Sequence, residues 1–223
     1  MIDTRSLSQQ VYDYLSEQII QGRLSYGQRI SMKQIGGELN VSTMPIRDAL
    51  KRLEMENVVE VKPRSSCYVK VPTKKAVLDS VEARRVLETY TLGKILPVVK
   101  NDLLGSLQDL VRRMEEEFEV YSRTENLRQY IELDRLFHRE IVSLAGNEYL
   151  QRFYQEVNMH LNMQYRYGIG APFNVELTLQ DHKDLVRYLV ENSRKAVEVL
   201  KEHLDRSYRN IISGKKFQSL PDR

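Results

Sequence analysis

One stretch decides the fold of the N-terminal part of the chain: Ser42-Thr43-Met44-Pro45-Ile46-Arg47-Asp48-Ala49-Leu50-Lys51-Arg52-Leu53-Glu54. Ser42 is a favourable helix N-cap, because its hydroxyl can accept a hydrogen bond from a free backbone N–H of the first turn. Pro45 falls in that first turn, where its missing N–H costs little. Ile46, Leu50 and Leu53 recur at helical spacing and indicate a buried stripe. The stretch therefore predicts a short helix whose basic residues lie outside the apolar face.

A second short helix is predicted directly upstream. Ser31-Met32-Lys33-Gln34 fits a capping box, and Ile35 and Leu39 form its apolar face. Asn40-Val41-Ser42 then reads as a tight turn between the two helices. This arrangement is a helix-turn-helix, whose second helix can enter the major groove of DNA. An ordinary helical hairpin is the alternative interpretation.

The residues that follow favour the DNA-binding interpretation. Val58–Lys62 and Cys67–Val71 are two short β-type runs, joined by the basic turn Pro63-Arg64-Ser65-Ser66. Arg29-Ile30 predicts a brief strand that pairs with this hairpin. A helix-turn-helix followed at once by a small basic hairpin is a winged helix.

The predicted DNA contacts lie on the second helix and in the hairpin turn: Ser42, Thr43, Met44, Arg47, Lys51, Arg52, Arg64 and Ser65. The formal net charge of the whole chain is only +3, so overall charge gives a weak signal for nucleic acid. The positive charge that binds phosphate must therefore be local, on these basic side chains.

Residues 41–69 resemble the signature of the GntR family of bacterial transcription regulators: a capping Ser, Pro, a hydrophobic residue, Arg, an acidic residue, Ala-Leu, Leu-Glu and the wing. The resemblance implies a homodimer that binds a palindromic double-stranded DNA operator. Many relatives have Arg where this chain has Thr43, which implies a different operator sequence, because Arg is the usual partner of guanine. Relatives usually have Gly where this chain has Ser66.

Composition places the chain among globular proteins that can build a core. It has 223 residues, of which 41% are hydrophobic and 29% charged, so one or two domains are expected. It contains no apolar run long enough to span a membrane and no apolar signal segment at its start. The single cysteine, Cys67, excludes an intramolecular disulfide framework and is interpreted as a strand residue. A cytoplasmic protein without a membrane partner is expected.

The predicted fold class is mainly α, with a winged helix-turn-helix at residues 1–72, a linker at 73–76, an all-helical domain at 77–213 and a polar tail at 214–223. Six helical segments are predicted in the second domain: Ala76–Leu96, Asp102–Tyr121, Leu127–Leu144, Glu148–Tyr167, Val175–Val190 and Arg194–Ile212. Their short connections predict an antiparallel bundle.

Ionisable residues occur on the predicted inward faces of this bundle. Asp134 and His138 are four residues apart, so they lie one turn apart on the apolar face of their helix. His182 is in line with Leu185 on the next helix but one, and His203 is in line with apolar residues of the last helix. The fourth histidine, His160, is left outside this set.

Burying a carboxylate without compensation is expensive, and a divalent metal would compensate Asp134. Three imidazoles and one carboxylate suit zinc, nickel, manganese or iron. The alternative is a hydrogen-bonded core in which each histidine is satisfied and Asp134 pairs with one of them. Three of the four histidines are predicted to face inward together with an Asp, and this pattern favours a metal site over a hydrogen-bonded core.

A second resemblance concerns this bundle. Asp134-Arg135-Leu136-Phe137-His138-Arg139-Glu140-Ile141 and Ala145-Gly146-Asn147 resemble the FCD effector domain of the FadR subfamily, in its shorter, six-helix VanR-like form. The resemblance implies a metal bound by Asp134, His138, His182 and His203. It also places Arg84, in a stretch similar to the family's Arg-x-x-Leu-Glu, at the effector pocket; a purely structural Arg84–Glu88 pair is the alternative.

The expected function is a transcriptional regulator, a repressor relieved by a small carboxylic acid or alternatively an activator. The carboxylate would coordinate the metal and pair with Arg84. Three rival hypotheses are a sensor of the metal itself, a purely structural metal site and a metal-dependent enzyme. The sequence supports an enzyme least, because Asp134 is used as a ligand and no general base is evident beside the metal.

Overall fold

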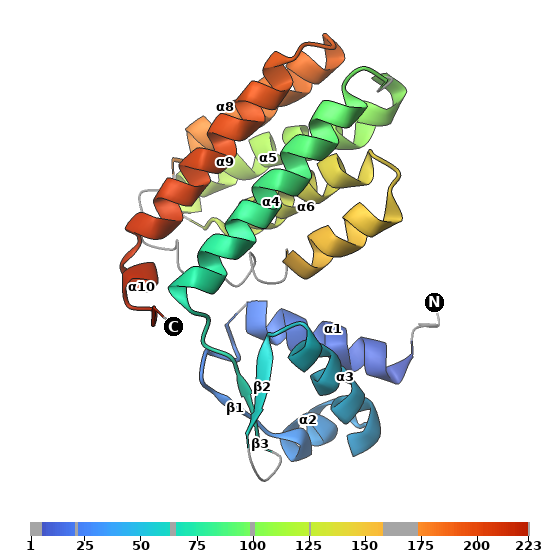
Figure 1. The fold of residues 1–223 in the computed structure, drawn as a ribbon, viewed down its shortest axis with the longest axis vertical. Helices are drawn as coiled ribbons and strands as arrows, with labels where there is room; N and C mark the ends of the chain where they lie inside the picture. The colour runs from blue at the N-terminus through green and yellow to red at the C-terminus, as the bar shows by residue number, and fades with distance from the viewer. Residues whose placement is uncertain are drawn as a thin grey trace. The chain divides into compact units, whose positions relative to one another are not determined.

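The structure is a computed structural model that describes residues 6–20, 22–62, 66–98, 101–124, 126–157 and 174–222. Its chain divides into two compact units, one formed by Met1–Lys74 with Leu220–Arg223 and one by Lys75–Ser219 (Figure 1). Each unit is described by itself below. The mainly α fold with a winged helix-turn-helix and a helical bundle, predicted from the sequence, is confirmed.

The first unit contains the predicted helix-turn-helix, with α1 at Leu7–Ile20, α2 at Met32–Leu39 and α3 at Thr43–Met55. Apolar residues of all three helices are buried against one another: Val11, Leu15, Ile19, Ile35, Ile46, Leu50 and Leu53. The capping box is confirmed at α2, where the Ser31 hydroxyl accepts from the backbone N–H of Gln34. Ser42 occupies the N-cap of α3 as predicted, but its side chain makes no capping hydrogen bond.

A three-stranded antiparallel sheet completes the winged helix. Its strands are β1 at Arg29–Ile30, β2 at Val59–Lys62 and β3 at Ser66–Val69, in the order β1-β3-β2. The predicted pairing of the brief first strand with the hairpin is confirmed, because Arg29 lies opposite Tyr68. Cys67 is buried in β3, and burial raises the pKa of its thiol to about 11, so the thiol is neutral at physiological pH.

The turn between α2 and α3 depends on Asn40, which adopts a left-handed conformation with φ of 52° and donates its backbone N–H to the carbonyl of Gly36. Asn tolerates this conformation, whereas a β-branched side chain does not. We expect Asn40→Val to lower the free energy of unfolding of the winged helix by about 1–2 kcal/mol. Urea unfolding followed by circular dichroism measures this, with Asn40→Gly as the control that should cost little. Equal losses for both variants would contradict the conformational explanation.

The second unit is an antiparallel bundle. Its elements are α4 at Lys74–Ile95, the 3-10 turn η1 at Asn101–Leu104, α5 at Gly105–Thr124, α6 at Arg128–Ser143, a helical segment at residues 148–157, α8 at Val175–Val190, α9 at Lys195–Ser213 and α10 at Lys215–Gln218. The predicted segment Val175–Val190 agrees residue for residue with α8. The second half of the predicted segment Glu148–Tyr167 lies outside the described residues.

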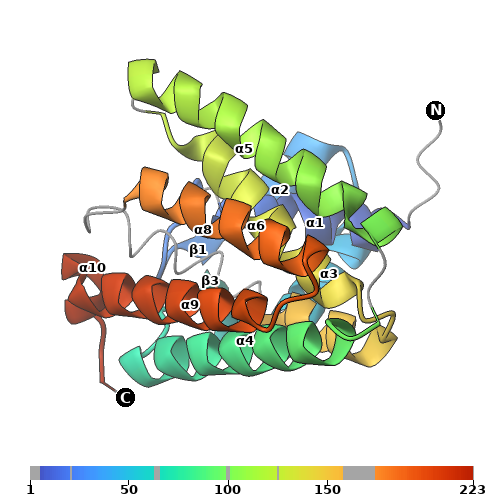
Figure 2. The same ribbon diagram turned by 90° about the horizontal axis from the view of Figure 1, so that it is seen from above.

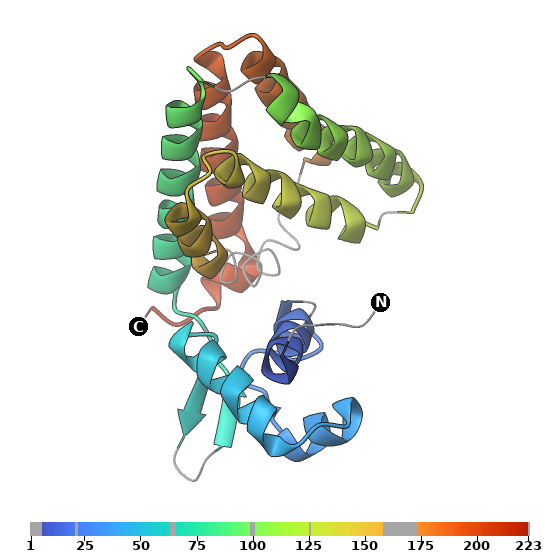
Figure 3. The same cartoon turned by 90° about the vertical axis from the view of Figure 1, so that its right-hand side faces the viewer.

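The bundle encloses its core between α4 and α9 on one side and α5, α6 and α8 on the other (Figures 2 and 3). An ion pair of 3.0 Å between Arg85 and Asp205 joins α4 to α9. The largest fully buried side chains in this unit include Tyr130, Phe137 and Tyr154. Side chains that point inward from α4, α6, α8 and α9 therefore meet in the same interior.

The predicted polar tail at residues 214–223 contains a short helix and two buried apolar side chains. Residues 215–218 form α10, and Phe217 is buried within the second unit. Leu220 is also buried, and the backbone N–H of Lys74 donates to the carbonyl of Pro221. These two apolar side chains are buried although the stretch around them is polar.

Among the described residues, none of the helices combines the length and the apolar character that crossing a membrane requires.

Candidate functional site

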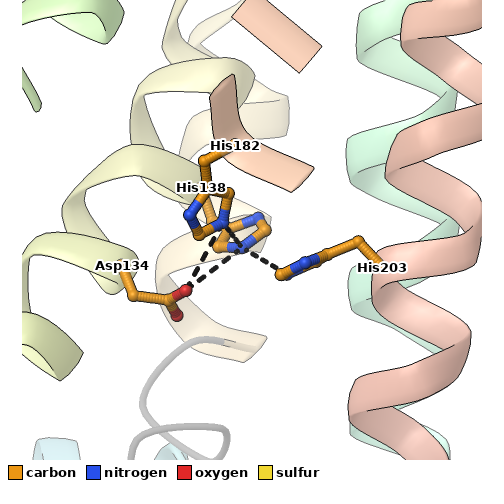
Figure 4. A group of neighbouring side chains, drawn as sticks. All are labelled: Asp134, His138, His182 and His203. Atoms are coloured by element: carbon orange, nitrogen blue, oxygen red, sulfur yellow. Dashed lines mark hydrogen bonds and ion pairs between the residues drawn. The ribbon is translucent and has the colours of Figure 1, made fainter. Parts of the chain in front are cut away.

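Four buried side chains from three helices converge in the bundle interior (Figure 4). Asp134 and His138 come from α6, His182 from α8 and His203 from α9. One ligand atom of each residue lies within 4.8 Å of the others. The sequence-based expectation that these four side chains point into one interior is met by this geometry.

The Nε2 atoms of the three imidazoles face one another. The Nε2 of His138 lies 3.1 Å from that of His203 and 3.4 Å from that of His182. A carboxylate oxygen of Asp134 lies 3.5 Å from Nε2 of His182 and 3.9 Å from Nε2 of His138. Each of the four residues thus contributes one atom to a common centre.

His138 is held from outside by α4. Its Nδ1 lies 2.6 Å from Oε2 of Glu88, which is fully buried. The other oxygen of Glu88 accepts from Nε of Arg84 at 2.6 Å and from the hydroxyl of Tyr154 at 2.8 Å. The Arg84–Glu88 pair, which was the alternative to a pocket role for Arg84, is therefore present, and Glu88 also contacts a histidine of the cluster.

His203 has a similar outer partner. Its Nδ1 lies 3.0 Å from Oδ2 of Asp181, and the same oxygen forms an ion pair with Arg206. Asp181 precedes His182 in the sequence, so α8 supplies both a member of the cluster and a carboxylate that holds another member. The Nδ1 of His182 is buried without a hydrogen-bond partner among the residues that the structure describes.

The electrostatics of the interior keep the imidazoles neutral. Burial lowers the pKa of His138, and the charge of Arg84 lowers it further. Burial also lowers the pKa of His203, and it brings the pKa of His182 well below its usual range, with His203 and His138 adding to the shift. Burial opposes ionisation of Glu88, but Arg84 and His138 outweigh it and lower its pKa to about 2.

This donor set fits a divalent transition metal. Because Glu88 and Asp181 accept from Nδ1, His138 and His203 present unprotonated Nε2 lone pairs to each other at 3.1 Å. Two such acceptors repel unless a cation lies between them. Ligand atoms bound to zinc at about 2.0–2.1 Å in a tetrahedron are about 3.3–3.4 Å apart. The separations of 3.1, 3.4, 3.5 and 3.9 Å given above lie on both sides of this value.

The predicted DNA-contacting residues of α3 are largely accessible. Ser42, Thr43, Met44, Arg47 and Lys51 are all exposed, and the side chain of Met44 is 73% exposed. Arg47 and Lys51 make no side-chain hydrogen bond or ion pair within the described part of the chain. Their charges are therefore available to phosphate or to base edges.

Arg52 differs from this group because it packs against α1. Its guanidinium stacks 3.7 Å from the ring centre of Tyr12, donates to Gln9 at 2.8 Å and pairs with Glu56 at 3.1 Å. Tyr12 in turn donates to Glu56 at 2.6 Å. The structure thus gives Arg52 a packing role between α1 and α3, which sequence spacing alone did not indicate.

Two further predicted DNA contacts, Arg64 and Ser65, lie outside the described residues, as does His160. The roles of Glu88 and Asp181 as outer partners of histidines were missed in the sequence. The sequence offered one signal for these roles, the spacing: Glu88 lies four residues after Arg84, and Asp181 directly precedes His182. Neither spacing indicates which histidine each carboxylate reaches.

Comparison with protein families matches almost the whole chain to two models. Residues 7–69 match the model for bacterial regulatory proteins of the gntR family, and residues 79–206 match the FCD domain. The first match spans the winged helix, and the second contains all four residues of the buried cluster.

Individual proteins agree with these models. An uncharacterized HTH-type transcriptional regulator of Bacillus subtilis (strain 168), YdhC, is 25% identical over 87% of this chain and 84% of its own length. The gluconate operon transcriptional repressor of the same organism is 26% identical over 64% of this chain and 57% of its own length. The solved structure of E. coli McbR/YncC covers 94% of this chain and 99% of its own, with a TM-score of 0.78 and 22% identity, which supports the fold.

Proposed function

Because the chain belongs to the GntR family of bacterial transcription regulators and carries an FCD domain, we propose that it regulates transcription in response to a small carboxylic acid bound at a metal in that domain. The proposed metal ligands are Asp134, His138, His182 and His203. One observation carries the proposal: these four side chains bring three imidazole nitrogens and one carboxylate oxygen within 4.8 Å of one another in a buried interior.

The class of function follows from the family itself. Its matched relatives are transcriptional regulators, and some are repressors, so the prediction of a DNA-binding regulator rather than an enzyme is confirmed. Assignment to the FadR subfamily stays a prediction. Repression, a homodimer and a palindromic operator belong to the proposal.

The chain's own residues would perform three tasks. Neutral imidazoles and Asp134 would hold a zinc, nickel, manganese or iron ion, which when bound supplies a Lewis-acidic position for an effector carboxylate. Arg84 would pair with the same carboxylate, in competition with Glu88. Binding would then favour one arrangement of the two DNA-binding domains of a dimer over others.

On the DNA side, we propose that α3 reads the major groove. Ser42 and Lys51 would contact the backbone, Arg47 would contact phosphate or a base edge, and Thr43 and Met44 would contact bases through apolar groups. Arg64 and Ser65 of the wing turn remain proposed contacts. Arg52 is left out of this set, because α1 holds its guanidinium.

The proposal is tested first by elemental analysis of the full chain, purified without a histidine tag or a chelator. We expect about one first-row transition metal per chain. Affinity for an operator, selected from a random duplex library, is then measured with and without metal and with a panel of small carboxylic acids. Gluconate belongs in the panel, because one relative represses a gluconate operon.

Each outcome separates the rival hypotheses. An acid that changes operator affinity only in the presence of metal supports the proposal. A change with metal alone would indicate a metal sensor, and bound metal without a response to any acid would favour a structural site. Absence of metal would make the cluster a hydrogen-bonded core network and leave the effector site unassigned.

A further inference from the structure

Two series of side-chain contacts lead to the buried cluster, and each runs from an arginine through a carboxylate to a histidine. One runs from Arg84 through Glu88 to His138, and the other runs from Arg206 through Asp181 to His203. They differ in whether the arginine and the histidine contact different oxygens of the carboxylate or the same one. This difference has a consequence for the histidine that each carboxylate holds.

Glu88 divides its partners between its two oxygens. Oε1 accepts from Nε of Arg84 at 2.6 Å and from the Tyr154 hydroxyl at 2.8 Å. Oε2 faces Nδ1 of His138 at 2.6 Å. An ionised carboxylate only accepts hydrogen bonds, so the proton must be on Nδ1 of His138 and the Nε2 lone pair must face the cluster.

Asp181 uses one oxygen for both neighbours. Its Oδ2 lies 3.0 Å from Nδ1 of His203 and forms the ion pair with Arg206. The position facing the histidine is therefore the same position that faces the arginine. Any atom at this position therefore faces both the arginine and the histidine.

We propose that Glu88 is a positioning residue that fixes the tautomer of His138 and thereby its capacity to bind metal, while Arg84 decides which atom of the residue 88 side chain faces the imidazole. The part that concerns metal depends on the function proposed above. The part that concerns the tautomer stands on the contacts of Glu88 alone. The proposal predicts that two carboxylate-to-amide substitutions have different results: one weakens metal binding and the other leaves it unchanged.

Glu88→Gln should reverse the tautomer. The Nε–H of Arg84 can only donate, so it holds the amide oxygen at the Oε1 position and leaves the amide NH2 facing Nδ1 of His138. The NH2 donates to Nδ1, and the ring proton must move to Nε2, where it points into the cluster. Asp181→Asn is the matched control, because its amide oxygen at the Oδ2 position accepts from both Arg206 and His203.

Metal affinity is measured by competition with a chelator, and the visible absorption of bound Co²⁺ reports the ligand set. We expect Glu88→Gln to weaken affinity about 10–100-fold and to change the Co²⁺ spectrum. Asp181→Asn should leave both unchanged within error. Equal losses of metal affinity in the two variants would overturn the proposal. Such losses would be explained by the removal of any carboxylate that contacts a histidine of the cluster, whatever the tautomer.

Glu88→Gln also removes the carboxylate charge that pairs with the buried Arg84. A second variant is therefore needed to separate a folding defect from the change of tautomer. Arg84→Met with Glu88→Gln removes both the charge and the group at the Oε1 position that can only donate. The Tyr154 hydroxyl beside that position can donate or accept, so it does not fix the amide. The amide oxygen can then turn to His138, and metal affinity should recover toward that of the wild type. A double variant that binds as weakly as Glu88→Gln, while folded by circular dichroism, would overturn the role given to Arg84.

Long-range ¹⁵N–¹H correlation spectra of the metal-free protein read each histidine tautomer directly. We expect a proton on Nδ1 of His138 in the wild type and in Asp181→Asn, and on Nε2 in Glu88→Gln. An unchanged His138 tautomer overturns the inference, whatever the metal results are. If Glu88→Gln switches the His138 tautomer but the wild-type protein binds no metal, the inference about the tautomer is supported and the proposed function is overturned.

Discussion

We expect Asp134→Ala and His138→Ala each to reduce the metal content from about one ion per chain to near zero. Both residues are buried in α6, and their ligand atoms take part in the convergence with His182 and His203. Removing one ligand leaves three protein donors, and Asp134, His138, His182 and His203 are the only described residues grouped at this centre. Elemental analysis of purified variants measures the effect.

The same variants should lose the stability that metal supplies. A ligand present at about 100 times its dissociation constant stabilises the folded state by about 2.7 kcal/mol. We therefore expect a chelator to lower the thermal midpoint of the wild type by several degrees and to leave both variants unaffected. Differential scanning fluorimetry with and without chelator makes this comparison on the full chain.

Glu132→Ala is the matched control for this experiment. Glu132 lies on α6, two residues before Asp134, and its side chain is 48% exposed and paired with Arg135. The substitution removes a carboxylate from the same helix without touching the cluster, so metal content should stay at the wild-type level. Full metal content in Asp134→Ala and His138→Ala would exclude the ligand assignment.

Much of this site could be predicted from sequence because it depends on helical periodicity. Asp134 and His138 lie one turn apart, and His182 and His203 are in line with apolar residues of their own helices, so an inward direction follows for each. The same reasoning passed over Leu133 and Phe137, which are buried beside them. A helix inside a bundle buries a wider face than one stripe of residues indicates.

Contacts between helices could not be predicted in this way. The partners of Glu88 lie 50 and 66 residues away, on α6 and on the segment at 148–157. Arg52 looked like its neighbours Arg47 and Lys51 on a helical wheel, but Gln9, 43 residues away, holds it against α1. Which helices pack together, and which rotamers result, is a tertiary property that local spacing does not contain.

Arg47→Ala should weaken operator binding more than any other single substitution on the exposed side of α3. Arg47 is exposed and makes no side-chain hydrogen bond or ion pair within the described part of the chain, so its guanidinium is available to DNA. A lost arginine contact to a base costs about 1–3 kcal/mol, and a dimer that binds two half-sites loses this twice. Fluorescence anisotropy with a labelled operator measures the affinity.

Two companion variants determine which kind of contact is lost. Arg47→Lys keeps the charge but not the planar fork, so it should retain affinity if Arg47 contacts phosphate and lose it if Arg47 reads guanine. A phosphate contact also predicts that the salt dependence of log K decreases by about one per contact in Arg47→Ala. Arg52→Ala serves as the control, because its guanidinium is held by Tyr12 and Gln9.

Arg52→Ala should therefore lower the stability of the winged helix and leave the salt dependence of operator binding unchanged. Loss of its contacts with α1 acts on folding, whereas loss of Arg47 acts on the DNA interface alone. Equal thermal midpoints for Arg47→Ala and the wild type, together with a weaker operator complex, would place Arg47 at the interface. Unchanged operator affinity at physiological salt would remove Arg47 from the reading surface and shift that role to Thr43, Met44 and the wing.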